Sequence, residues 1–155
     1  MKIYITIASF ILSTFGFAQT NFNPCAYKGF THAKIIEILG KPTMQRNDAT
    51  SGGKPRNISE FAHAELGEIK VVFVDNVIRA ISWKPKTKLS LTEAQIKNKD
   101  FTNLPFDFKS CIYDDVEWVI QDYIIVWRLK DASLESRIML DDNKNIVEFG
   151  YKYVK

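Results

Sequence analysis

An alternating apolar run is the feature of this sequence that most limits how the chain can fold. In the run EIKVVFVDNVIRAISW, the side chains of Ile69, Val71 and Phe73 share one face of an extended chain. The Asp75-Asn76 pair that follows them tolerates the left-handed backbone of a tight hairpin turn. The run and the residues before it therefore predict antiparallel strands at residues 58–65, 68–75 and 77–83.

The second half of the chain repeats this strand pattern. Its runs VEWVI, DYIIVWRL, LESRIMLD and NIVEFGYKYV are separated by short polar turns and predict four more antiparallel strands. A short helix is predicted before each group of strands, over residues 31–39 and 91–98, from cap signals and, for the first, a Gly-Pro stop. The polar run at residues 45–57, which contains two glycines and a proline, predicts an exposed mobile loop.

This order of elements predicts an α+β fold in which short helices pack on one face of an antiparallel meander sheet. Two pairs of segments also match: FTHAKI parallels LTEAQI, and residues 67–83 parallel residues 134–151. The match favours two helix-meander units, residues 29–84 and 88–155, that share one sheet. The alternative is a coincidence between generic hairpins.

The first 18 residues have the pattern of a signal peptide. Lys2 precedes an apolar core at residues 3–17, and the segment closes on the small-x-small sequence Gly16-Phe17-Ala18. This core is shorter than the ~20 apolar residues that a membrane-spanning helix needs, although an uncleaved anchor is the alternative. We expect cleavage to leave residues 19–155 as a single exported domain without a membrane anchor, either periplasmic or secreted.

Composition narrows the class of partner. The hydrophobic share of 46% and the charged share of 25% are typical of a folded, soluble domain. The net charge is +3, and the loss of Lys2 with the leader leaves +2. This excess is too small to favour a nucleic-acid partner.

Export also favours a disulfide between the two cysteines, because disulfides form and persist in oxidising compartments. Cys25 and Cys111 are the only two cysteines of the chain, so they are predicted to form one disulfide. The alternative is two separate buried thiols, which are common in protein cores.

The first unit resembles a known family. The features in order are Gly29-Phe30-Thr31, Leu39-Gly40-Lys41-Pro42 and the run GEIKVVF. This order resembles the SmpA/OmlA domain of outer-membrane assembly lipoproteins over about residues 29–83. Two such units in tandem are similar to the secreted β-lactamase-inhibitor protein fold, and that resemblance implies a sheet whose open face grips a partner protein. No functional residue is carried over from either family.

Motifs for catalysis are missing from the sequence. Histidine is the residue type most suited to act as a general base near neutral pH. The chain has two histidines, His32 and His63, and neither lies in a G-x-S-x-G or H-E-x-x-H pattern. The carboxylates of Asp114, Asp115 and Glu117 fit either a cation site or, more simply, a solvated loop. The sequence thus favours a non-enzyme and predicts neither a metal nor a cofactor.

A calcium-loop pattern begins at Asp141 but is not completed. Asn143 and Asn145 continue it, whereas Ile146 replaces the glycine of position six and Lys152 replaces the glutamate of position twelve. We therefore interpret the segment DDNKN as a hairpin turn.

Aromatic residues gather in the second group of strands. Trp and Tyr are favoured where proteins grip partners, so these residues predict a partner-binding surface, with core packing as the alternative. The residues proposed for this surface are Trp118, Tyr123, Trp127 and Tyr151.

Taken together, the sequence favours an exported, non-catalytic domain that binds another protein through its sheet face, as an inhibitor or an envelope-assembly accessory. The competing hypothesis is a small exported hydrolase or ligand-binding domain that uses His63 and the carboxylates between Asp114 and Glu117.

Overall fold

Short antiparallel hairpins build most of the protein. The computed structural model describes residues 24–64, 66–101, 104, 116–129 and 134–153, and the predicted signal peptide at residues 1–18 lies outside this part. In chain order the elements are the 3-10 helix η1 (Pro24–Tyr27), α1 (His32–Leu39), β1 (Met44–Ala49), β2 (Pro55–His63), β3 (Gly67–Val74), β4 (Val77–Pro85), α2 (Glu93–Asn98), β5 (Val116–Gln121), β6 (Ile124–Leu129), β7 (Leu134–Leu140) and β8 (Ile146–Tyr153).

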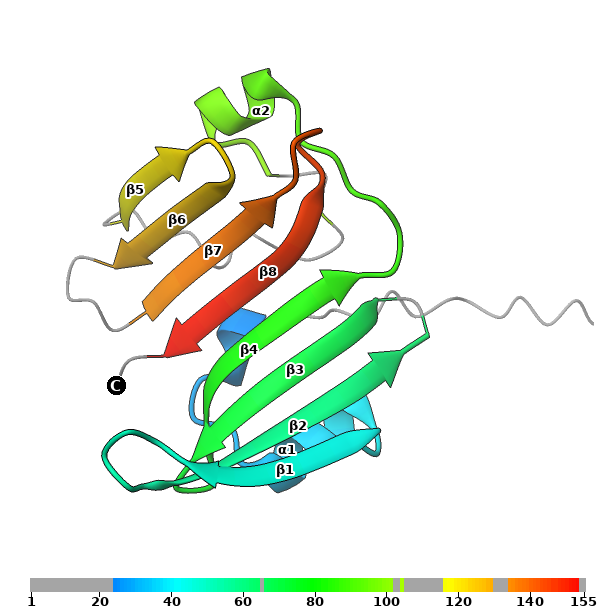
Figure 1. Cartoon of the computed structure of the whole chain (residues 1–155), viewed down its shortest axis with the longest axis vertical. Helices are drawn as coiled ribbons and strands as arrows, with labels where there is room; N and C mark the ends of the chain where they lie inside the picture. Colours follow the sequence, from blue (N-terminus) through cyan, green and yellow to red (C-terminus); the bar gives the residue numbers. More distant parts are fainter. Residues whose placement is uncertain (1–23, 65, 102–103, 105–115, 130–133, 154–155) are drawn as a thin grey trace, which may run out of the picture.

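The eight strands of the described part form one antiparallel sheet with the order β1-β2-β3-β4-β8-β7-β6-β5 (Figure 1). Neighbouring strands are consecutive in sequence except at the centre, where the last strand, β8, pairs with β4. In that central pairing Ile81 lies opposite Tyr151, and Trp83 lies opposite Phe149. The sheet therefore has two edges, β1 and β5, and a single seam between its halves.

The prediction of an α+β fold, with short helices packed on one face of a meander sheet in two helix-meander units, is wrong, because the protein is mostly β. The helices α1 and α2 have only eight and six residues. Ile35 is the only buried residue of α1, and α2 has none. Helices that bury so little apolar surface cannot form a layer of their own, so the sheet and its loops make the core. Within the described ranges, no helix is long and apolar enough to cross a membrane.

The expected loop at residues 45–57 is also corrected. β1 occupies Met44–Ala49, and β2 begins at Pro55. All six residues of β1 are exposed, so this strand has no buried face and no alternating apolar pattern to reveal it. Only the pairing with β2 shows that it belongs to the sheet.

One face of the sheet, called the covered face here, carries the core. Strand alternation points most of the large apolar side chains of the inner strands to this face. Figure 1 shows α1 behind β1–β3, on the same side. The Tyr153 hydroxyl of β8 donates a hydrogen bond to the Pro24 carbonyl of η1, which ties the entry segment to this layer. The core residues of the strands include Phe61, Ile69, Val71, Phe73, Ile81, Trp83, Ile125, Trp127, Ile138, Phe149 and Tyr151.

Candidate functional site

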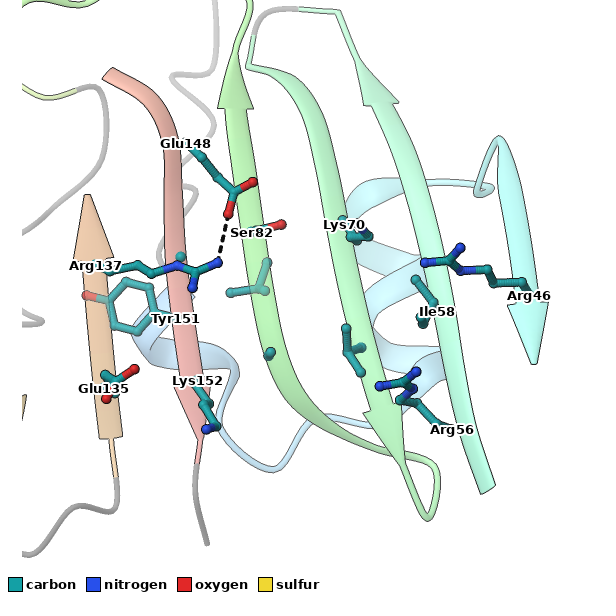
Figure 2. A pocket seen from close by; sticks show the side chains of 14 residues that line it. Arg46, Arg56, Ile58, Lys70, Ser82, Glu135, Arg137, Glu148, Tyr151 and Lys152 are labelled. Atoms are coloured by element: carbon teal, nitrogen blue, oxygen red, sulfur yellow. Dashed lines mark hydrogen bonds and ion pairs between the residues drawn. The ribbon is translucent and has the colours of Figure 1, made fainter. Parts of the chain in front are cut away.

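The opposite face of the sheet, called the open face, is the candidate site. No helix of the described part covers it, and Figure 2 shows α1 behind the strands that carry its side chains. Strand pairing aligns its residues in two rows that cross all eight strands. One row contains Met44, Glu60, Lys70, Ser82, Gly150, Arg137, Val126 and Val119. The other contains Arg46, Ile58, Val72, Ala80, Lys152, Glu135, Arg128 and Glu117.

A hollow of about 400 Å³, called the central hollow, lies in the middle of the open face, between β1 and β7 (Figure 2). It lies over the seam because the cross-strand neighbours there are small. Ser82 on β4 lies opposite Gly150 on β8, and Ala80 lies one step along the same strand. Larger side chains on the flanking strands rise around these small residues and form the walls.

The central hollow is basic. Its cationic side chains outnumber its two carboxylates, Glu135 and Glu148. These cations come from β1, β2, β3, β7 and β8, and they are Arg46, Arg56, Lys70, Arg137 and Lys152.

Two of the cations are held by carboxylates. Arg56 donates two hydrogen bonds to Asp48 on β1, over 2.5 and 2.7 Å. That bidentate pair lowers the pKa of Asp48 and raises the pKa of Arg56. Arg137 donates to Glu148 across 3.0 Å. The positive charges of these two arginines are therefore partly offset within the chain.

A smaller hollow of about 200 Å³ adjoins the central one and shares Lys70, Ser82 and Glu148 with it. Its remaining charged residues are Glu60, Glu68 and Lys84, so carboxylates outnumber cations there. The open face consequently carries a basic centre beside a more acidic end, which gives it a polarity that a partner can match.

The predicted aromatic surface is divided by the structure. Trp127 and Tyr151 are 1% and 2% exposed and lie in the core, so they cannot contact a partner unless the sheet rearranges. Trp118 is partly buried on the covered face and stacks on Trp127 with ring centroids 5.3 Å apart. Tyr123, at the turn between β5 and β6, is 54% exposed and is the one predicted residue that is freely accessible.

The two residues of the hydrolase hypothesis that the structure describes, His63 and Glu117, are not brought together. His63 ends β2, and its Nδ1 accepts a hydrogen bond from the Leu66 amide over 3.2 Å, which closes the turn into β3. Glu117 lies on β5, six strand spacings away, or about 29 Å at roughly 4.8 Å per strand. Asp114 and Asp115 lie outside the described residues.

The other histidine, His32, belongs to a polar network beneath the sheet. Its Nε2 lies 3.0 Å from the Ser59 hydroxyl and 2.9 Å from the Gln45 side-chain amide. Its ring also meets the Phe73 ring edge-on, with centroids 4.9 Å apart. These contacts fix α1 against β1 and β2, and Ser59 is fully buried.

The turn that begins at Asp141, where the sequence starts like a calcium loop, is closed by hydrogen bonds between its own residues. The Asp141 carboxylate accepts hydrogen bonds from the backbone amides of Asn143 and Asn145, both over 2.9 Å, and from the Asn145 side chain. In the described residues no three His, Cys, Asp or Glu side chains are grouped to hold a metal ion.

The predicted disulfide stays a prediction. Cys25 lies within η1, and Cys111 lies outside the described residues.

The cations of the central hollow were missed by sequence reasoning. Their signal is the alternation itself, because Lys70 lies between the buried residues Ile69 and Val71 and must point to the opposite face. What the sequence could not show is that Arg46, Lys70 and Lys152 come from strands that lie near one another in the sheet.

Comparisons with known proteins identify a fold and no family. No protein-family model matches the chain, and no curated protein matches it. An extracellular protein from Bacillus anthracis that contains an SCP domain is similar in structure, with a TM-score of 0.52 and 8% identity, over 99% of this chain and 49% of that one. A cysteine-rich secretory protein from Staphylococcus aureus gives a TM-score of 0.49 and 9% identity, over 83% of this chain and 45% of that one.

A DUF4309 family protein from Bacillus subtilis gives a TM-score of 0.33 and 14% identity, over 79% of this chain and 78% of that one. This chain thus spans about half the length of the first two proteins.

The resemblance to SmpA/OmlA domains and to the β-lactamase-inhibitor protein is therefore wrong, since the fold is similar to that of an SCP-domain protein. The segment Leu39-Gly40-Lys41-Pro42 only marks the end of α1, and the run GEIKVVF only forms a hairpin strand. Both patterns occur in unrelated folds.

Proposed function

We propose that this chain is an exported, non-catalytic domain that binds another protein on the open face of its sheet. The observation that carries the proposal is the contrast between the two faces. One is filled by the core, whereas the other presents two aligned rows of charged, small and apolar side chains around a hollow.

The size of the open face supports a protein partner. Eight strands at about 4.8 Å spacing span roughly 34 Å, and strands of six residues or more extend about 20 Å. The resulting area of roughly 700 Å² is close to the ~800 Å² that one partner contributes to an ordinary protein interface. The mixture of charged and apolar groups is also typical of such interfaces.

Export is supported by the predicted signal peptide at residues 1–18. The similar protein from Bacillus anthracis is described as extracellular, which agrees with this part of the proposal. The absence of catalysis is supported by the two histidines, since His63 closes a turn and His32 fixes α1.

A matched pair of serine variants tests the proposal. Ser82→Trp fills the central hollow from β4, and Ser51→Trp places the same side chain in the exposed turn between β1 and β2. Immobilised mature chains are incubated with the exported-protein fraction of the source cells, and retained proteins are quantified by mass spectrometry. We expect a discrete protein to be retained by the wild type and by Ser51→Trp and to be lost with Ser82→Trp.

Circular dichroism and thermal unfolding of both variants verify that each has folded. Equal retention by folded Ser82→Trp, or no protein retained by the wild type above the level of a blank resin, would contradict binding through this face.

A further inference from the structure

We propose that the central hollow receives carboxylate side chains of the partner, so that the open face recognises an acidic protein segment. This inference rests on the proposed function and adds the chemistry of the ligand.

Three cations of the hollow carry the argument. Arg46, Lys70 and Lys152 line it and make no ion pair with any other described residue, whereas Arg56 and Arg137 are paired. Lys70 is half-buried, whereas Arg46 and Lys152 are exposed. Lys70 therefore gains the most from a partner charge, because less water screens a charge that is partly buried. The hollow therefore presents the positive charges of Lys70 and Lys152 without an ion pair to another described residue, while the charge of Arg46 also acts on Asp48.

The spacing of these cations suits a protein segment. Lys70 pairs with Ser82, and Lys152 pairs with Ala80 on the same strand, β4. Their backbones are therefore about 12 Å apart, from two strand spacings and a two-residue offset. The side chains of Lys70 and Lys152 are long enough to bind the same carboxylate between them. They can also bind two carboxylates that lie several residues apart on one bound segment.

The floor of the hollow supports the same class of ligand. Ile58 and Val72 lie in one transverse row with Ala80, beside the cations. An acidic protein segment offers apolar side chains to these residues as well as carboxylates to the lysines, which a simple inorganic anion does not.

The carboxylates of the hollow argue against a uniformly charged polyanion. Glu135 lies opposite Lys152, and Glu148 holds Arg137. A phosphate chain or sulfated sugar that filled the hollow would approach both glutamates and be repelled, whereas a protein segment can place its acidic side chains at the lysines alone.

Gly150 sets this arrangement of charges. A Cβ atom there would lie 3.2 Å from the Arg137 Nε and 3.3 Å from its Cγ. The glycine thus lets Arg137 lie flat across β8, as Figure 2 shows, and reach Glu148. With Arg137 occupied in this way, Arg46, Lys70 and Lys152 are left as the cations available to a partner.

The experiment uses a capped hexaglutamate peptide as the probe and follows ¹⁵N–¹H chemical shifts of the mature chain. We expect saturable shifts at the amides of β3, β4 and β8 around the hollow, which weaken as salt rises. The double variant Lys70→Glu/Lys152→Glu should weaken binding at least tenfold. The control Lys28→Glu/Lys97→Glu makes the same change of net charge at exposed positions outside the hollow and should stay within twofold.

Three results would overturn the inference. They are an absence of saturable shifts at the hollow, equal weakening by the control variant, and binding of tripolyphosphate to the same amides at a lower concentration than hexaglutamate. None of these bears on whether Ser82→Trp loses a natural partner, so failure of the carboxylate site and failure of the proposed function are distinguishable.

Discussion

The side chain of Asp141 determines the structure of its segment, whose sequence begins like a metal-binding loop but forms a turn. Its carboxylate accepts hydrogen bonds from the Asn145 side chain and from the backbone amides of Asn145 and Asn143. The hydrogen bonds from Asn145 are the main cause that lowers the pKa of Asp141 below its usual 3.8. Lys144 follows in a left-handed conformation with φ of 60°, as a tight turn requires. The segment is therefore an Asx-type turn closed by its own residues.

A pH dependence follows from this lowered pKa. Because the folded-state pKa lies below that of the unfolded chain, the Asp141 carboxylate stabilises the fold above about pH 4. This contribution is lost as the pH falls through the folded-state pKa. We expect Asp141→Asn to lower the thermal unfolding temperature at pH 7 and the difference from wild type to shrink toward pH 2. A constant difference across that range, measured by circular dichroism, would mean that the charge does not stabilise the turn.

The sequence pattern predicted the strands well, but it overestimated how much the helices contribute to the core. β3 buries Ile69, Val71 and Phe73 on one face, as the alternation indicates. β6 likewise buries Ile125 and Trp127. α2 has a complete capping box at Thr92 and Gln95 but no buried residue. A cap predicts where a helix begins, whereas its importance in the fold depends on how much apolar surface it buries.

The hairpin of β5 and β6 gives a prediction for its aromatic residues. Trp127 contacts the rings of Phe101, Trp118 and Phe149, so Trp127→Ala should cost about 3–5 kcal/mol in free energy of unfolding. Tyr123 is largely exposed, and Tyr123→Ala should change that free energy by no more than about 0.5 kcal/mol. Urea unfolding followed by far-UV circular dichroism measures both. Similar costs for the two variants would show that Trp127 is not a core residue.

The whole molecule is organised by the pairing of β4 with β8. These strands are more than 60 residues apart in sequence, yet their pairing joins the two halves and creates the central hollow. The hydrophobic core continues across this seam, from Trp83 on one side to Trp127 on the other. The molecule should accordingly be most stable at the middle of the sheet and least stable at its edges.

Amide hydrogen exchange tests this gradient of stability. We expect the slowest exchange in β3, β4, β8 and β7, whose alternate residues are buried, and the fastest in β1, all of whose side chains are exposed. Mass spectrometry of peptides from the exchanged mature chain measures the order. Protection in β1 equal to that in β4 would show that the edge is held by more than its pairing with β2.

The sequence by itself determined the strands with a buried face, the helix boundaries to within two residues and the turns at Asp75-Asn76 and Asp141, because period and turn chemistry are local properties. Only the tertiary structure decided that β1 is a strand, that Trp127 and Tyr151 are core residues, and that β8 lies beside β4. The cations Arg46, Lys70 and Lys152 meet only through those pairings. Which strands become neighbours depends on long-range contacts. The alternation of residues along one strand predicts its buried face but does not predict its neighbour.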